Sequence, residues 1–230
     1  MEDYGYIKRN YTELTEELAD IAARVGVATP TLVCVTKSGS DEELLELAAA
    51  GATDIGENRP GEVKRRGELM RANGYTPRMH EIGTLQRNKV KLVVGDAALI
   101  HSVDSVRLAQ DIDRLAEKAG RTVPVLIEVN CAKEENKSGV FPEDTEELLK
   151  QICDLSSIHV VGLMTMGPAV DDAEMLRGYF RATKELFDRL GAKYGFGDAP
   201  ILSMGMSDSY RVAIEEGSTL VRVGRKLFKK

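Results

Sequence analysis

The stretch Leu32-Val33-Cys34-Val35-Thr36-Lys37-Ser38-Gly39-Ser40-Asp41-Glu42-Glu43 contains one complete junction between a strand and a helix. Its first part is almost continuously hydrophobic, which is typical of a parallel strand covered on both faces. Ser40, followed three residues later by Glu43, predicts a capping box that starts a helix over 41–50. Lys37 lies where the strand ends. The stretch therefore predicts one β-strand followed directly by one α-helix.

The same alternation continues along the rest of the chain. Short apolar runs predict eight strands, at 32–37, 53–58, 78–83, 98–104, 123–130, 159–166, 200–205 and 220–228. Apolar residues at helical spacing predict helices at 7–25, 41–50, 105–119, 144–154 and 172–191.

Eight strand-helix units in 230 residues fit a (β/α)8 barrel, which typically takes ~250 residues. A doubly wound open sheet is the alternative, because counting strands does not prove that the sheet closes. No Pro- or Ser-rich linker interrupts the alternation. We therefore expect an α/β fold, a single (β/α)8 TIM barrel domain over 1–230 with an extra N-terminal helix.

Composition excludes several classes of function. The net charge of −6 argues against a nucleic-acid-binding surface, which needs a concentrated basic face. The three cysteines and three histidines show no zinc-ligand spacing, so we expect no metal site and reduced thiols. No signal peptide and no apolar run of ~20 residues are present. The sequence predicts a soluble, cytoplasmic protein without nucleic-acid or membrane partners, and we expect a monomer.

The ends of the predicted strands are where a barrel of this kind places its chemistry. Lys37 stands at the first of them. Partial burial and cationic neighbours can make such a lysine nucleophilic toward an aldehyde. A strand-end lysine paired with a carboxylate is the alternative interpretation.

The last two predicted strands carry a possible phosphate site. Ser203-Met204-Gly205-Met206-Ser207 precedes a helix predicted over 208–216, with Ser207 as its N-cap. Helix N-termini and glycine loops suit phosphate. Val221-Arg222-Val223-Gly224-Arg225 follows on the next strand, and barrels frequently bind phosphate after these two strands. Capping without a ligand is the alternative.

At this point the strand ends resemble a known family, the YggS/PROSC family of proteins that bind pyridoxal 5'-phosphate (PLP), over nearly the whole chain. The matching stretches are Val35-Thr36-Lys37, Gly56-Glu57-Asn58-Arg59, HEIGTLQRNK at 80–89, Val129-Asn130, Glu135-Asn136-Lys137-Ser138-Gly139, GLMTM at 162–166, SMGMSD at 203–208 and AIEEGSTLVRVG at 213–224.

The resemblance implies a fold like the N-terminal barrel of alanine racemase, a fold-type III PLP protein, with PLP at the barrel mouth. Lys37 would form a Schiff base, and Ser207 with the backbone N–H groups of Gly224 and Arg225 would hold the phosphate. Arg222 would face the pyridine nitrogen. The complete set of expected cofactor-binding residues is Lys37, Asn58, His80, Lys137, Met164, Ser203, Ser207, Arg222, Gly224 and Arg225. By itself, His80 is better read as a core histidine, and Met164 as core filling.

The resemblance implies a role in vitamin B6 homeostasis, with PLP-dependent apoenzymes as candidate recipients. A weak amino-acid racemase is the alternative. Racemases resembling this barrel use a second base, a tyrosine contributed with a second domain, and only Tyr210 could approach the site here. We therefore expect a PLP carrier without catalytic residues. A third interpretation is a barrel enzyme acting on a phosphorylated sugar or nucleotide.

Overall fold

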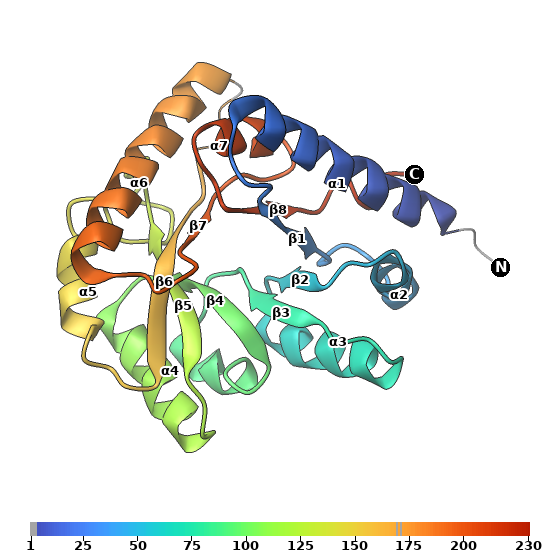
Figure 1. Ribbon diagram of the computed structural model, residues 1–230. Coiled ribbons are helices and arrows are strands. Elements are labelled where there is room, and N and C mark those ends of the chain that lie inside the picture. The colour runs from blue at the N-terminus through green and yellow to red at the C-terminus, as the bar shows by residue number, and fades with distance from the viewer. Residues whose placement is uncertain (1–3, 169, 171) are drawn as a thin grey trace.

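The computed structural model describes residues 4–168, 170 and 172–230, and eight strands within them close into a parallel barrel (Figure 1). The strands pair in chain order and β8 returns to β1, so the predicted barrel is confirmed and the open sheet is excluded. The strands are β1 Thr31–Val35, β2 Asp54–Glu57, β3 Arg78–Glu81, β4 Ala97–Val103, β5 Val123–Val129, β6 Ile158–Thr165, β7 Ile201–Ser203 and β8 Leu220–Val223.

Helices surround the barrel, and α1 precedes the first strand as expected (Figure 1). Their bounds are α1 Gly5–Val25, α2 Asp41–Ala49, α3 Pro60–Ala72, α4 Val106–Lys118, α5 Thr145–Ile152, α6 Ala173–Tyr194 and α7 Tyr210–Glu215, with a 3-10 helix, η1, at Arg87–Leu92. The capping box of α2 is present, because Ser40 and Glu43 bond each other's backbone N–H groups. The sequence did not predict α3 or η1.

Two predicted boundaries near the C-terminus are wrong. The last strand ends at Val223, where the chain turns at Gly224. Helix α7 begins at Tyr210, so Ser207 is not its N-cap, and Ser209 occupies that position. The Ser207 hydroxyl instead accepts a hydrogen bond from the Gly224 N–H at 3.4 Å. The physical reason is a turn over 206–209, in which the Ser209 N–H donates to the Met206 carbonyl and delays the helix.

The core has two layers, because side chains of a strand alternate between its faces. Between the sheet and the helices lies a large apolar layer. A small apolar cluster fills the barrel itself, formed by Val33, Leu99, Leu126, Met164 and Leu220. Buried polar side chains, among them His80, His101 and Arg222, share the barrel interior with this cluster. Those that reach the carboxyl ends of the strands can bind a ligand.

The three cysteines are free thiols, of which Cys34 is buried. Among the described residues, no helix is both long enough and apolar enough to cross a membrane. The same part of the chain contains no cluster of His, Cys, Asp and Glu that could hold a metal ion.

Gly162→Ala is expected to destabilise the fold by about 1–3 kcal/mol, because it adds a side chain where the backbone of β6 approaches β7. Gly162 has φ +151°, and an added Cβ would lie 1.9 Å from the Ile201 carbonyl oxygen. The measurement is urea unfolding. The control is Gly178→Ala on the exposed face of α6, where no atom lies within 4 Å; it should stabilise by about 0.5–1 kcal/mol. Equal changes in the free energy of unfolding for the two variants would contradict this explanation.

Candidate functional site

The carboxyl ends of the strands surround a cavity of about 440 Å³, called here the strand-end cavity. This volume is within the ~300–1,000 Å³ range of small-molecule sites. Val35, Glu128 and Arg222, all buried, contribute to its lining from β1, β5 and β8. Six of the ten residues predicted to bind a cofactor line it: Lys37, Asn58, Ser207, Arg222, Gly224 and Arg225.

Lys37 lies two residues beyond the end of β1, at the mouth of the barrel. Its side chain is exposed, and within the described residues its amine makes no hydrogen bond or ion pair. The backbone around it is held from α3: the guanidinium of Arg66 donates to the carbonyl of Thr36 at 2.6 Å and to that of Gly39 at 2.7 Å. The chain therefore presents a freely accessible amine on an anchored backbone.

Ser207, Gly224 and Arg225 bring polar hydrogens to the adjoining wall of the cavity. A Cβ added at Gly224 would lie 2.9 Å from the Val35 carbonyl oxygen, so glycine permits the close approach of this loop to β1. The guanidinium of Arg225 pairs with Asp208. A backbone N–H, a hydroxyl and a guanidinium at one wall form an arrangement that suits a phosphate group.

Arg222 is 4% exposed and is fixed by two hydrogen bonds. Its guanidinium donates to the Ser203 hydroxyl and, at 3.0 Å, to the Thr165 carbonyl. Burial lowers the pKa of Arg222 to about 10, and the nearby Glu128 opposes that shift. The group is still protonated at neutral pH. It therefore presents a fixed cation and hydrogen-bond donor to the cavity.

Below Arg222 a chain of hydrogen bonds runs through the barrel interior. Ser203 Oγ lies 3.0 Å from His101 Nδ1, and His101 Nε2 lies 2.9 Å from His80 Nδ1. His80 Nε2 lies 3.0 Å from Asp54 Oδ1, at the start of β2. Both histidines, like Ser203, are fully buried.

The groups at the two ends of this series of hydrogen bonds, Arg222 and Asp54, determine the direction of every hydrogen bond in it. A guanidinium can only donate, so Arg222 donates to Ser203, and the Ser203 hydroxyl then donates to His101. An ionised carboxylate only accepts, so the Nε2–H of His80 donates to Asp54, and that of His101 donates to His80. Burial lowers the pKa of both histidines, which agrees with neutral rings.

Four predicted residues lie outside the strand-end cavity. His80 and Ser203 belong to the buried chain below Arg222, and Met164 packs in the apolar interior of the barrel. Direct cofactor contact by these three stays a prediction: all three side chains are buried, and none of them lines the strand-end cavity. Lys137 lies in a neighbouring cavity, where its amine pairs with Glu134 at 2.7 Å.

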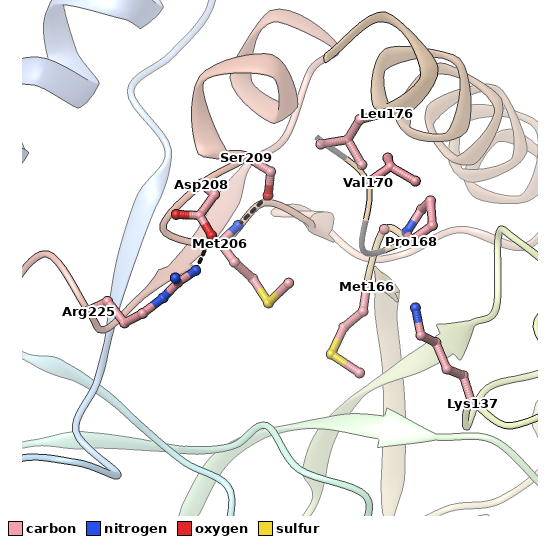
Figure 2. A pocket seen from close by; sticks show the side chains of 10 residues that line it. Lys137, Met166, Pro168, Val170, Leu176, Met206, Asp208, Ser209 and Arg225 are labelled. Carbon is pink, nitrogen blue, oxygen red and sulfur yellow. Dashed lines mark hydrogen bonds and ion pairs between the residues drawn. The ribbon is translucent and has the colours of Figure 1, made fainter. Parts of the chain in front are cut away.

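The neighbouring cavity has a volume of about 480 Å³ and shares Met166, Met206 and Arg225 with the strand-end cavity. Figure 2 shows Lys137 on one side of it and the paired Arg225 and Asp208 on the other. Although it is the larger of the two, it lacks Lys37, Arg222 and Gly224. The strand-end cavity is therefore the candidate site, and the neighbouring cavity opens beside it.

Sequence reasoning missed Glu128, which lines the strand-end cavity from β5 and is 2% exposed. The sequence carried a signal for it. A carboxylate within the apolar run Val123–Val129 is out of place in a strand covered on both faces, unless it has a specific partner or function.

Comparison with known proteins agrees with this geometry. The family model described as "Alanine racemase, N-terminal domain" matches residues 10–230. A pyridoxal phosphate homeostasis protein of Aquifex aeolicus is 42% identical over 197 residues, which cover 86% of this chain and 85% of the relative. PipY of Synechococcus elongatus, solved with PLP bound, superposes with a TM-score of 0.85 at 29% identity, covering 97% of this chain and 100% of PipY. A protein of unknown function from Bifidobacterium adolescentis superposes with a TM-score of 0.92 at 34% identity, covering 99% and 97% of the two chains.

Proposed function

The chain belongs to the alanine racemase N-terminal domain family and, within it, to the YggS/PROSC family of pyridoxal phosphate homeostasis proteins, and from this premise we propose that it binds PLP in the strand-end cavity and serves PLP homeostasis. One observation carries the proposal. A single cavity of suitable size brings together an accessible lysine amine, a group of phosphate donors and a buried guanidinium.

These groups fit the polar parts of PLP. Lys37 would hold the aldehyde end of PLP, because its accessible primary amine can condense with an aldehyde with loss of water. Ser207 and the backbone N–H groups of Gly224 and Arg225 would hold the phosphate. Arg222 would offer its guanidinium as a donor to the pyridine nitrogen.

The proposed role is that of a carrier without efficient catalysis. Bound PLP supplies an electron-withdrawing ring, and Arg222 weakens this property because a guanidinium that stays protonated disfavours protonation of the ring nitrogen. Tyr210 does not line the strand-end cavity; its hydroxyl contacts the amine of Lys226. Tyr210 is therefore not placed to act as the second base that a racemase requires.

The wider role follows from the same proposal. As a carrier, the protein would hand PLP to PLP-dependent apoenzymes in the cytoplasm, acting as a single-domain monomer. The support for this step is the accessible amine at an open barrel mouth, from which another protein's lysine can take the cofactor by exchange.

The proposal is tested by adding PLP to the purified protein, recording its visible spectrum and reducing the mixture with borohydride before peptide mapping. We expect a Schiff-base absorption band and one pyridoxyl-modified peptide, which contains Lys37. The absence of any band and of any reducible adduct at saturating PLP would overturn the proposed binding mode. Amino-acid racemisation at ordinary enzyme rates would overturn the carrier role.

A further inference from the structure

Glu128 is the one acidic side chain that lines the strand-end cavity within the described residues. It follows Leu126 by two positions on β5, and Leu126 belongs to the apolar cluster inside the barrel. Because side chains alternate along a strand, Glu128 also faces the interior. It thus lies one inward-facing position beyond Leu126 toward the carboxyl end of β5, where it lines the strand-end cavity.

The carboxyl group of Glu128 has an unsatisfied position. Its Oε2 atom is buried and has no hydrogen-bond partner among the described residues, and none of the described ion pairs joins Glu128 to Arg222. A buried carboxylate oxygen without a partner is costly, whereas a protonated carboxyl loses its charge and gains a donor. The site therefore favours a neutral acid that can donate to a ligand atom.

The charged groups around Glu128 have opposite effects on its pKa. Burial is the main influence on its pKa, Asp104 at the end of β4 adds to it, and Arg222 on β8 opposes it, so that the pKa rises to about 7. Lys37, in the loop after β1, and Arg225, in the turn after β8, line the same cavity. Glu128 is therefore near the midpoint of its titration at neutral pH before any ligand binds.

We propose that Glu128 is a proton-linked ligand residue of this cavity: it carries a proton whenever a phosphorylated pyridine is bound, so that ligand uptake above neutral pH takes up one proton. The inference rests on the proposed function, because it requires a phosphorylated ligand in the cavity. Two physical effects of that ligand drive the protonation. It displaces the remaining water from Glu128, and its phosphate adds negative charge nearby.

The sign of the pH dependence follows from linkage. Well below pH 7 the carboxyl is protonated in both the free and the loaded protein, and binding involves no proton exchange at Glu128. Above pH 7 the free protein has lost the proton that the loaded protein keeps. Affinity should therefore fall by up to about tenfold for each further pH unit until the loaded protein also loses its proton.

The test uses pyridoxine 5'-phosphate, which lacks the aldehyde and so cannot form a Schiff base with Lys37. Its dissociation constant is measured by titration calorimetry from pH 6 to pH 8.5 for the natural protein and for Glu128→Gln. Ionisation of the ligand itself affects both proteins equally and cancels in the ratio of their constants. We expect this ratio to change by at least about tenfold over the range, with the natural protein losing affinity as the pH rises.

Repeating the titration at pH 8 in buffers of different ionisation enthalpy counts the protons directly. The natural protein should take up close to one proton more than Glu128→Gln. Glu128→Met, which keeps a similar volume without an ionisable group, should follow the glutamine variant. It replaces that variant as the reference if the glutamine protein does not fold.

The matched control is Glu81→Gln. Glu81 is also buried, its Oε2 also has no hydrogen-bond partner among the described residues, and burial raises its pKa to about 8. It lies on the same face of β3 as Met79, however, toward the helices, and does not line the strand-end cavity. The dissociation constant of Glu81→Gln for pyridoxine 5'-phosphate should change with pH in parallel with that of the natural protein.

The possible outcomes separate the two proposals. Proton linkage is overturned if the dissociation constants of the natural protein and both Glu128 variants change in parallel with pH and if all three proteins take up the same number of protons. The proposed function would then remain intact. If pyridoxine 5'-phosphate binds none of the folded proteins, and PLP does not bind either, the proposed function itself fails.

Discussion

Lys37→Ala is expected to abolish the borohydride-reducible adduct with PLP and the absorption band that accompanies it. The reason is that the accessible amine of Lys37 is the nucleophile that the strand-end cavity offers to the aldehyde. PLP should still bind, but more weakly, because Ser207, Gly224 and Arg225 remain to hold its phosphate. The measurement is peptide mass mapping after reduction, together with equilibrium dialysis of unreduced PLP.

Lys150→Ala is the control for this variant. Lys150 lies on α5, its side chain is 52% exposed, and it lines neither of the two cavities described above. Its replacement should leave the adduct and the spectrum unchanged. If the Lys37→Ala protein instead retains a full-yield adduct on Lys137, the lysine of the neighbouring cavity is the nucleophile, and the assignment of Lys37 is wrong.

Arg66→Ala is expected to lower the free energy of unfolding by about 3–5 kcal/mol, the usual cost of removing one partner of a buried ion pair. Arg66 on α3 is 6% exposed and pairs with Glu57, which is 1% exposed, at 3.0 Å. The variant also leaves the carbonyls of Thr36 and Gly39 without their guanidinium donor. Because these carbonyls flank Lys37, the yield of the PLP adduct should fall as well. Urea unfolding measures the first effect and borohydride trapping the second.

The neighbouring arginine provides a matched control. Arg65 pairs with Asp41 and Glu62, but its side chain is 45% exposed, so these ion pairs are screened by water. Arg65→Ala should therefore cost no more than about 1 kcal/mol and leave the PLP adduct unchanged. Similar losses of stability for the two variants would show that Arg66 acts as an ordinary surface charge.

The sequence determined the strands and the type of fold because both depend on local patterns. Continuous apolar runs indicate parallel strands. Because these runs alternate with segments of helical periodicity, the fold had to be either a closed barrel or an open sheet covered by helices. The capping box at Ser40 and Glu43 was likewise readable, since both partners lie within one helical turn. Lys37, Ser207 and Gly224 could be nominated because strand ends of a barrel meet at one face.

Helix α3 could not be read in the same way. The residues it buries are Val63, Arg66, Gly67 and Met70, which have helical spacing, but two of them are not apolar. Arg66 is buried because Glu57 and two backbone carbonyls of the loop after β1 satisfy its guanidinium. Those partners come from other elements, so the apolar period that marks a buried helix face is absent from the sequence of α3.

The tertiary structure alone decided the depth and charge of the site residues. His80, Ser203 and Arg222 come from separate strands, and only closure of the barrel links them into one chain of hydrogen bonds below the cavity. The same closure buries Glu128, which raises its pKa; Asp104 adds to this rise and Arg222 opposes it. The sequence by itself thus determined which groups reach the strand ends. Which of them meet the ligand and which carry a proton depends on burial and on partners distant in sequence, because the cost of charge and the direction of a hydrogen bond are set by the surroundings in space.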